Sequence, residues 1–180
     1  MHLYEKTILR DIIYEGKIFT VARDTVELED GSEAFRELVL HTGGAGILPI
    51  DEDGNVTLVR QYRAGAGAVL TEICAGKLEK GEDPLDCALR ELSEELGLEA
   101  QKVTPLGFLD PTPAYDSEKT YIFLAHNLKS VDRHPDKGEF MDIVKMPLEK
   151  ALESVYDGTL TDAKTQLALL KAERLLYGKN

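Results

Sequence analysis

The chain has 180 residues, of which 43 % are hydrophobic and 30 % are charged, and its formal net charge is −12 at pH 7. This composition is typical of a soluble globular protein with one domain, or with one domain and a small extension. The strongly negative charge argues against a nucleic-acid-binding protein, because such a protein needs a basic patch to neutralise backbone phosphates.

No membrane-spanning or secretory segment is expected. The chain has no long apolar run, and its first residues lack the pattern of a signal peptide. The two cysteines, Cys74 and Cys87, do not have the spacing of a disulfide framework or a zinc site, so we expect reduced thiols that serve packing. These features predict a cytoplasmic protein that binds neither a membrane nor nucleic acid.

The N-terminal part of the chain predicts a small antiparallel β-sheet. Segments 4–15, 17–28 and 33–41 are rich in β-branched and aromatic residues, and an Asp-Gly turn separates the last two. Three strands alone bury little apolar surface. We therefore assign residues 1–42 to an N-terminal sheet and expect this sheet to lean on a second subunit.

The rest of the chain, residues 43–180, predicts a second domain in which strands and helices are mixed. The expected elements are strands at 47–50, 55–63, 69–75, 103–110, 120–128 and 139–146, a helix at 84–96, a short helix from Pro147 to near Gly158, and a last helix from Thr161 or Asp162 to about Tyr177. This order indicates an α+β fold, an α/β/α sandwich with a mixed sheet.

The helix expected at 84–96 has clear start and stop signals. Asp83 can cap its N-terminus, and Gly97 suits the left-handed residue that follows the last turn. Apolar residues form one stripe of this helix, and Glu91 and Glu95 lie one turn apart beside that stripe. The helix therefore has a core face and a carboxylate edge.

The carboxylate edge has two interpretations: it can be a solvated acidic face, or it can bind a cation. Like charges four residues apart repel each other on an exposed helix, so helix stability does not require both Glu91 and Glu95. Clustered carboxylates, with backbone carbonyls and water, are the ligands that Mg2+ prefers, and Mg2+ commonly accompanies a phosphate substrate.

A wider pattern decides between these interpretations. Gly76 is followed after five residues by Glu82, and after seven more by the run Arg-Glu-Leu-Ser-Glu-Glu-Leu-Gly-Leu at 90–98. This stretch resembles the Nudix box at every defined position. The resemblance implies the Nudix fold and the hydrolysis of a diphosphate linked to another moiety, generally with Mg2+ or Mn2+ as the cofactor.

The resemblance to the Nudix box also implies roles for individual residues. Glu91 and Glu95 would be metal ligands, and Glu94 would be a further ligand or the group that orients water. The backbone carbonyl of Ala75 would complete the ligand set. Arg90 would orient the carboxylates or, alternatively, form a plain surface salt bridge.

Outside the box, the chain is similar to the ADP-ribose pyrophosphatase branch of this family over nearly its whole length. The similarity lies in four segments, 35–41 (FRELVLH), 59–65 (VRQYRAG), 72–82 (EICAGKLEKGE) and 111–125 (PTPAYDSEKTYIFLA). It implies hydrolysis of ADP-ribose to AMP and ribose 5-phosphate. It also implies a homodimer in which the N-terminal sheet is exchanged between subunits.

The same similarity indicates residues that would bind substrate. Arg36 and Arg63 would contact the phosphates or the terminal ribose, with Glu37 beside them, and Glu72 would lie near the base or sugar. Glu139 would act on the attacking water from a mobile loop. Each residue has an ordinary alternative, which is a charge on a strand surface or, for Glu139, a solvated loop acid.

Two positions depart from the pattern of this branch. Cys74 stands where the branch usually has Pro, and Ala114 stands where it usually has Gly. Ala114 belongs to a region that meets substrate, so two other functions stay open: hydrolysis of another nucleoside diphosphate sugar, for example GDP-mannose, and binding of ADP-ribose without cleavage. The presence of all three box glutamates argues against the second, because non-catalytic modules tend to lose them.

Overall fold

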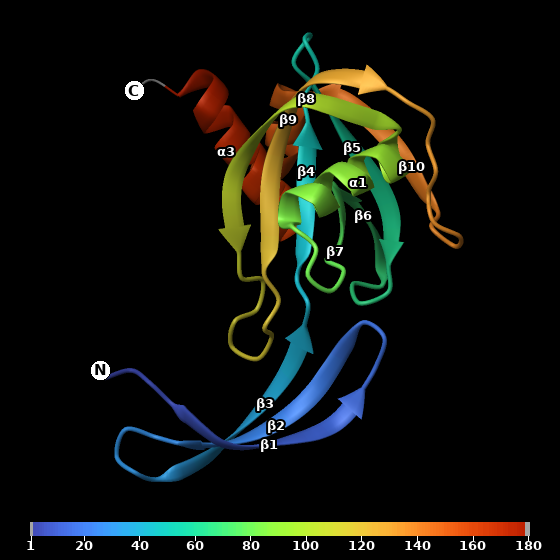
Figure 1. Ribbon diagram of the computed structural model, residues 1–180. Coiled ribbons are helices and arrows are strands. Elements are labelled where there is room, and N and C mark those ends of the chain that lie inside the picture. The colour runs from blue at the N-terminus through green and yellow to red at the C-terminus, as the bar shows by residue number, and fades with distance from the viewer. Residues whose placement is uncertain (1, 179–180) are drawn as a thin grey trace. The chain divides into compact units, whose positions relative to one another are not determined.

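The computed structural model describes residues 2–178, and the chain divides into two compact units (Figure 1). The first unit contains the described residues up to Gly43 together with residues 110–119, and the second contains residues 44–109 and the described residues from Thr120 onward. No helix among the described residues is both long and apolar enough to cross a membrane.

The first unit is a three-stranded antiparallel sheet with the strand order β1-β2-β3. Its strands are β1 (Lys6–Glu15), β2 (Phe19–Glu27) and β3 (Glu33–His41). The loop at 110–119 belongs to this unit because it binds the end of β3: the Val39 N–H donates to the Tyr115 carbonyl (2.7 Å), and the Ser117 N–H donates to the Val39 carbonyl (3.0 Å). The first unit is therefore built from two segments that are distant in sequence.

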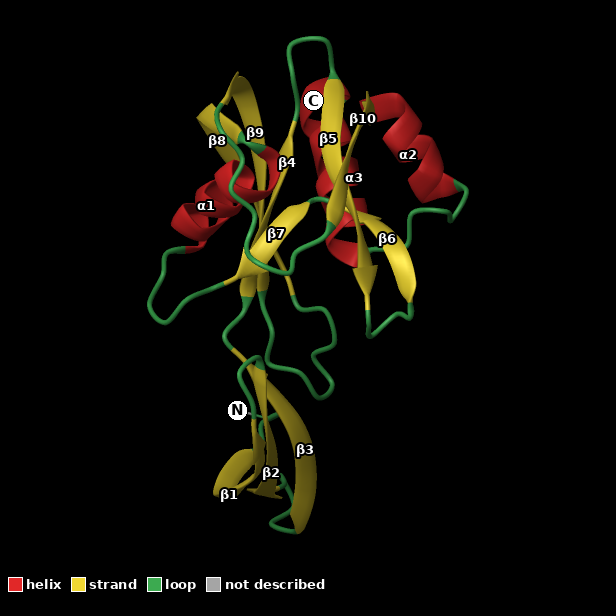
Figure 2. Cartoon of the chain, turned by 90° about the vertical axis from the view of Figure 1, so that its right-hand side faces the viewer, coloured by secondary structure: helices red, strands yellow, loops and turns green. Residues whose placement is uncertain are grey.

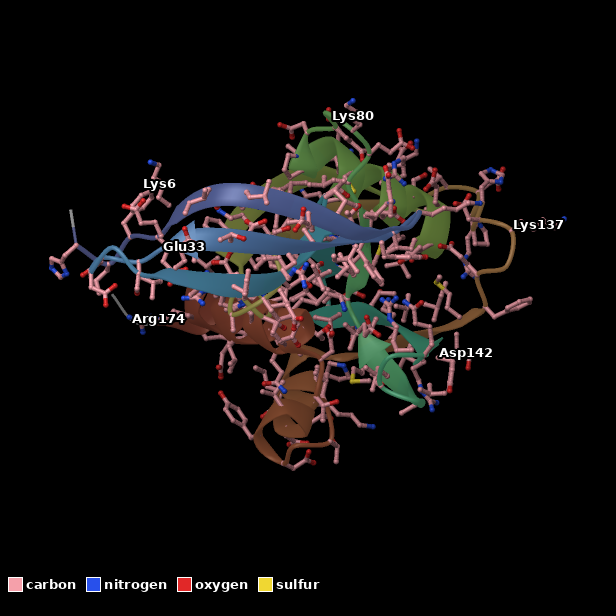
Figure 3. The ribbon with its side chains drawn as sticks, turned by 90° about the horizontal axis from the view of Figure 1, so that it is seen from below. Lys6, Glu33, Lys80, Lys137, Asp142 and Arg174 are labelled. Atoms are coloured by element: carbon pink, nitrogen blue, oxygen red, sulfur yellow. The ribbon has the colours of Figure 1, made fainter. Side chains whose placement is uncertain are left out.

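Charged residues stabilise the sheet of the first unit across neighbouring strands. The Arg10 guanidinium on β1 donates two hydrogen bonds, both of 2.7 Å, to the buried carboxylate of Asp24 on β2. At one end of the sheet, Lys6 of β1 and Glu33 of β3 both lie beside Glu27 of β2 (Figure 3). The bidentate arginine pair offsets the free-energy cost of burying a carboxylate.

The second unit contains two sheets and three helices. The four-stranded sheet has the order β7-β4-β9-β8, formed by β7 (Cys74–Lys77), β4 (Gly44–Pro49), β9 (Thr120–Ser130) and β8 (Leu98–Leu109). The three-stranded sheet has the order β10-β5-β6, formed by β10 (Met141–Pro147), β5 (Asn55–Arg63) and β6 (Ala68–Glu72). The helices are α1 (Pro84–Leu96), α2 (Leu148–Tyr156) and α3 (Ala163–Tyr177). Strand β4 runs parallel to β9 and antiparallel to β7, so the larger sheet is mixed.

Hydrophobic clusters lie on both faces of the four-stranded sheet. Alternate residues of β9 point to opposite faces, so Ile122 and Leu124 join the cluster that contains α2 and α3 residues, whereas Phe123 and Ala125 join the cluster that contains α1 residues. Figure 2 shows α1 and α3 on opposite sides of β4. This arrangement confirms the predicted α+β fold with a mixed sheet.

Helix α1 begins and ends where its sequence signals predict. The Asp83 side chain accepts a hydrogen bond of 2.8 Å from the Leu85 N–H, and Gly97 adopts a left-handed conformation with φ of 62°. A β-carbon at Gly97 would lie 2.8 Å from the Val131 carbonyl oxygen, so close packing also requires glycine there. These contacts confirm the prediction of a helix at 84–96.

The single strand predicted at 69–75 is wrong. The chain leaves the smaller sheet after Glu72 and enters the larger sheet at Cys74, so Ile73 lies between two strands that belong to different sheets. The stretch from Val69 to Ala75 contains no glycine or proline that would mark a break, and periodicity alone does not reveal a change of sheet within it. The predicted start of the last strand at 139 is also displaced, because β10 begins at Met141.

Candidate active site

The carboxylate edge of α1 faces the protein rather than the solvent. Glu91 and Glu95 are buried, and only 3 % of the surface of Glu95 is accessible to solvent. Strand β7 runs so close to the helix that a β-carbon on Gly76 would lie 1.7 Å from Oε1 of Glu91. Glycine at this position therefore makes room for the Glu91 carboxylate.

Arg90 links the carboxylates of this region. Its Nη1 donates to Oε1 of Glu91 (2.7 Å) and to Oε2 of Glu94 (3.1 Å), and its Nε donates to Oε1 of Glu82 (3.0 Å). Oε2 of Glu82 also accepts from the Glu79 N–H (2.9 Å), so Glu82 connects the preceding loop to the helix. One guanidinium thus partly compensates three negative charges.

The Glu95 carboxylate is incompletely satisfied. It accepts hydrogen bonds from the Cys74 thiol and the Ala75 N–H, yet Oε2 is a buried side-chain oxygen without a hydrogen-bond partner among the described residues. Burial raises the pKa of Glu95 to about 7, and the negative charges of Glu91 and Glu139 act in the same direction. A buried oxygen without a donor is costly unless a ligand or an ion satisfies it.

Glu91 has a related environment. Burial raises its pKa, Arg90 opposes this shift, and the charges of Glu94 and Glu139 add to it. Because Glu139 raises the pKa of both Glu91 and Glu95, the loop that carries it lies within electrostatic range of the helix edge. Four carboxylates therefore influence one another at this site.

A divalent cation fits the donors of this site. Hard cations bind carboxylate and carbonyl oxygens, and Oε2 of Glu95, which no described residue satisfies, is an oxygen of this kind. Across residues 2–178, no three His, Cys, Asp or Glu side chains are already grouped as a metal cage. Arg90 holds Glu91 and Glu94 at present, so a bound cation would have to take over part of the compensation that Arg90 provides.

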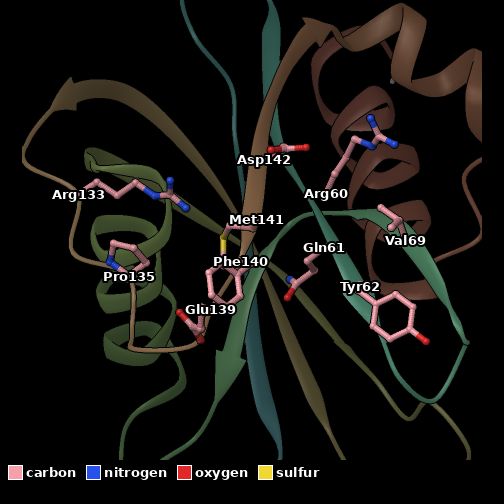
Figure 4. A pocket seen from close by; sticks show the side chains of 10 residues that line it. All are labelled: Arg60, Gln61, Tyr62, Val69, Arg133, Pro135, Glu139, Phe140, Met141 and Asp142. Carbon is pink, nitrogen blue, oxygen red and sulfur yellow. The ribbon is translucent and has the colours of Figure 1, made fainter.

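A cavity of about 450 Å³ adjoins Glu139. Its lining includes Arg60, Tyr62, Arg133, Glu139, Phe140 and Asp142. In Figure 4, Glu139 and Arg133 lie on the loop beside α1, and Arg60 and Tyr62 lie across from them on β5. The Glu139 carboxylate accepts a hydrogen bond of 3.1 Å from the Asp136 N–H, which gives this loop an internal contact.

Arg63 and Glu72 form a pair between β5 and β6. Arg63 donates from Nε to Oε1 (2.8 Å) and from Nη2 to Oε2 (2.7 Å) of Glu72, whose side chain is 1 % exposed. Lys164 of α3 also donates to Glu72, so both carboxylate oxygens have cationic partners within the protein. Arg63, with 41 % of its side chain exposed, is the member of this pair that can reach a ligand.

Arg36 and Glu37 belong to β3 of the first unit, whereas the other predicted site residues belong to the second unit. Arg36 pairs with Glu5, with a distance of 2.9 Å from Nε to Oε2, and its Nη1 donates to the Phe35 carbonyl (2.9 Å). In the sheet register, Glu37 lies opposite Arg23. Their proposed contacts with substrate stay predictions.

Sequence reasoning did not identify Lys164 or Arg133 as candidate site residues. Lys164 is 92 positions from its partner Glu72, and no local pattern pairs residues at that separation. Arg133 lies in a polar loop whose sequence has no repeat or motif. The one available signal was the helix-cap pattern at Asp162, which predicted where α3 begins but not what Lys164 contacts.

Known protein families match both parts of the chain. Residues 40–167 match the NUDIX domain profile, and residues 5–39 match the profile of the nucleoside diphosphate sugar hydrolase N-terminal domain. An ADP-ribose pyrophosphatase from Bacillus subtilis is 38 % identical over 169 residues, which cover 93 % of this chain and 91 % of the relative. A methanol dehydrogenase activator from Bacillus methanolicus is 35 % identical over 167 residues, which cover 92 % and 90 %.

The fold is shared with a solved structure. A crystal structure of an ADP compounds hydrolase superposes with a TM-score of 0.85 at 24 % sequence identity, covering 99 % of this chain and 97 % of that chain. At this level of identity the likeness concerns the fold. It extends over both units of the chain, including the N-terminal strands.

Proposed function

Because the chain belongs to the Nudix family, we propose that it is a divalent-metal-dependent pyrophosphatase that hydrolyses ADP-ribose to AMP and ribose 5-phosphate. The Bacillus subtilis relative carries the name of this activity, and the N-terminal profile match supports a nucleoside diphosphate sugar as substrate. The observation that carries the proposal is the buried carboxylate edge of α1, where Glu91 lies against Gly76 and Glu95 has an oxygen without a hydrogen-bond partner among residues 2–178.

The residues of the site divide into metal-binding and proton-handling groups. Glu91, Glu94, Glu95 and the Ala75 carbonyl would hold Mg2+ or Mn2+. The bound cation would neutralise the diphosphate and lower the pKa of water. Glu139 would accept the proton that water loses as its oxygen bonds to phosphorus and the bond to the bridging oxygen breaks. The effect of Glu139 on the pKa of Glu91 and Glu95 supports its placement beside this reaction.

Substrate would be held by guanidinium groups. Arg63 has one edge bound to Glu72 and exposes the rest of its side chain, which suits a phosphate oxygen. We propose that Arg36 and Glu37 also contact the substrate, as the family resemblance implies. Glu72 would then act close to the sugar or base through the arginine that it binds.

We also propose a cytoplasmic homodimer formed through the N-terminal sheet. Three isoleucines of β1 support it, because Ile8, Ile12 and Ile13 are 49 %, 53 % and 59 % exposed. An exposed strand with several large apolar side chains rarely stays uncovered in a soluble protein. Burial against a second copy would remove this surface from water.

Steady-state kinetics would test the reaction. We expect turnover of ADP-ribose to exceed that of GDP-mannose and UDP-glucose, to require Mg2+ or Mn2+, and to stop in EDTA, with AMP detected by chromatography. Glu95→Gln should abolish the metal-supported turnover while the fold is retained by circular dichroism. A preference for GDP-mannose would support the alternative substrate, and no metal-dependent turnover on any of the three would favour a binding module.

A further inference from the structure

A group of three residues at the start of α3, which we call the α3 clamp, contacts the end of strand β6. The clamp consists of Asp162, Lys164 and Thr165. Lys164 Nζ donates to the Glu72 carboxylate and to Oδ1 of Asp162 (2.8 Å). Oδ2 of Asp162 accepts from the N–H (3.0 Å) and the hydroxyl (2.5 Å) of Thr165, so the same carboxylate caps the helix and holds the lysine.

The α3 clamp also holds the point where the chain passes from one sheet to the other. The buried hydroxyl of Thr165 accepts a hydrogen bond of 2.8 Å from the N–H of Ile73, the residue between β6 and β7. A buried backbone N–H needs such an acceptor when it lies between strands. Helix α3 therefore fixes the two residues, Glu72 and Ile73, that directly precede the β7 side of the site.

Glu72 extends the α3 clamp to Arg63. Its buried carboxylate binds Nε and Nη2 of Arg63, which fixes the plane of the guanidinium and leaves Nη1 for another partner. Lys164 binds the same carboxylate from α3, so the carboxylate cannot rotate freely with the arginine. The orientation of Arg63 thus depends on a lysine that is far away from it in sequence.

The charges of this cluster are balanced. Arg63 and Lys164 are cationic, and Glu72 and Asp162 are anionic, so loss of the lysine would leave one excess negative charge beside Arg63. Arg63 also lies within electrostatic range of Glu95, because the charge of Glu95 contributes to raising the pKa of Arg63. An excess negative charge at this place would repel an anionic diphosphate.

We propose that Lys164 is a positioning residue that acts through Glu72 to hold Arg63 in the orientation that binds a substrate phosphate. Asp162 and Thr165 hold Lys164 and the end of β6 in place. Glu72 is then the group that orients Arg63, and it acts on the substrate through this arginine. This inference rests on the proposed function, because it assigns the ligand of Arg63 to the diphosphate of the same substrate.

Three variants would test the proposal. Lys164→Met removes the ammonium group and keeps an apolar chain, and Lys164→Arg restores the charge. Lys171→Met is the matched control, because Lys171 lies on the same helix and its Nζ donates to the Leu106 carbonyl (2.5 Å), away from the clamp. Calorimetry would measure the Kd of an ADP-ribose analogue with a methylene group in place of the bridging oxygen, and kinetics with ADP-ribose and Mg2+ would give kcat and KM.

We expect Lys164→Met to raise the Kd and the KM about tenfold, while kcat stays within about threefold of wild type. Lys164→Arg and Lys171→Met should bind the analogue with a Kd within about twofold of wild type. If Lys164 served stability alone, Lys164→Met would lower the unfolding temperature without raising KM while kcat stays nearly unchanged. The unfolding temperature of each variant is therefore measured as well.

A Kd for Lys164→Met within about twofold of wild type would overturn the proposal, whatever its unfolding temperature. Equal weakening in Lys164→Arg or Lys171→Met would also overturn it, as would a wild-type protein that does not bind the analogue. A wild type that binds the analogue but does not cleave ADP-ribose would contradict only the proposed reaction, and weaker binding by Lys164→Met would then still support the positioning role.

Discussion

The Glu95 carboxylate lies in an environment that is unfavourable for a charged group. It lies in the protein interior next to Glu91, and one of its oxygens has no hydrogen-bond partner among the described residues. A glutamine of the same shape would avoid the cost of burying a charge. The retention of an acid at this position is understandable if the carboxylate serves a cation.

This environment predicts how stability depends on pH in metal-free protein. The folded-state pKa of Glu95, about 7, lies above its ordinary value of 4.5. The folded state therefore binds this proton more tightly than the unfolded state. The stabilisation that the bound proton gives to the folded state is complete below pH 4.5 and is lost as the pH rises through 7. When the pH is raised from about 5 to about 8 in EDTA, we expect the free energy of unfolding of wild type to fall by ~2 kcal/mol more than that of Glu95→Gln.

Urea unfolding at each pH measures this difference between wild type and Glu95→Gln. Glu79→Gln is a suitable control, because Glu79 is an exposed glutamate just before the same helix, and its unfolding free energy should follow the wild-type pH dependence. If the stability of Glu95→Gln fell with pH as steeply as that of wild type, the burial of an ionisable Glu95 would not be the cause.

Glu139 makes a second prediction at the scale of a residue. Glu139→Gln should lower kcat about a hundredfold and leave KM within about twofold, because a proton acceptor acts in the transition state and not in substrate binding. Asp132→Asn, an exposed acid in the same loop, should retain wild-type kinetics. An increase in KM with an unchanged kcat would instead identify Glu139 as a binding residue.

The site lies where α1 packs against β7. At Gly76 the two elements approach so closely that there is no room for a β-carbon. Gly76 of β7 lies where any β-carbon would overlap the Glu91 side chain, with Oε1 at 1.7 Å and Cδ at 2.1 Å. The atoms that collide belong to the far end of a flexible side chain. A methyl group there should therefore displace the Glu91 carboxylate more than it unfolds the protein.

Gly76→Ala should accordingly reduce metal-dependent turnover about a hundredfold, with a change in unfolding free energy of no more than ~2 kcal/mol. Kinetics at several Mg2+ concentrations and urea unfolding measure the two effects. Gly65→Ala is the matched control, because a β-carbon at Gly65 meets nothing within 4 Å. Wild-type turnover in Gly76→Ala would show that the position of Glu91 is not important for the reaction.

The boundary between β6 and β7 illustrates how far local patterns predict elements. The α1 boundaries follow from Asp83 and Gly97, since capping groups act on the residues beside them. The break at Ile73 has no such local cause, because the acceptor for its N–H is the hydroxyl of Thr165, 92 residues later. A prediction from neighbouring residues therefore succeeds for the helix and misses the change of sheet.

At the scale of the whole molecule, the first unit exposes several large apolar side chains. Strand β1 is exposed along its full length and includes isoleucines and a tyrosine. Three strands without a covering layer are marginally stable in water. A second subunit that covers this sheet would explain both features.

Light scattering after size exclusion would test this assembly. We expect a mass of two chains for wild type and a shift toward one chain for Ile12→Lys, because an ammonium group would be buried without a partner in the interface. Leu175→Lys, which changes an exposed apolar residue of α3 in the second unit, should remain dimeric. A wild-type protein with the mass of one chain would contradict the proposed dimer.

The sequence by itself placed Glu91 and Glu95 on one edge of α1 and indicated the class of fold, because spacing along a helix and alternation along strands follow from local geometry, whereas the cation chemistry expected at that edge rested on the resemblance to the Nudix box. It also sufficed to select Glu91, Glu94, Glu95, Arg63 and Glu139 as candidates. Tertiary structure alone revealed that Glu72 is held by Arg63 and Lys164, and that one Glu95 oxygen has no hydrogen-bond partner in the described part of the chain. Burial and long-range pairing arise when distant segments pack together, so no local stretch of sequence specifies them.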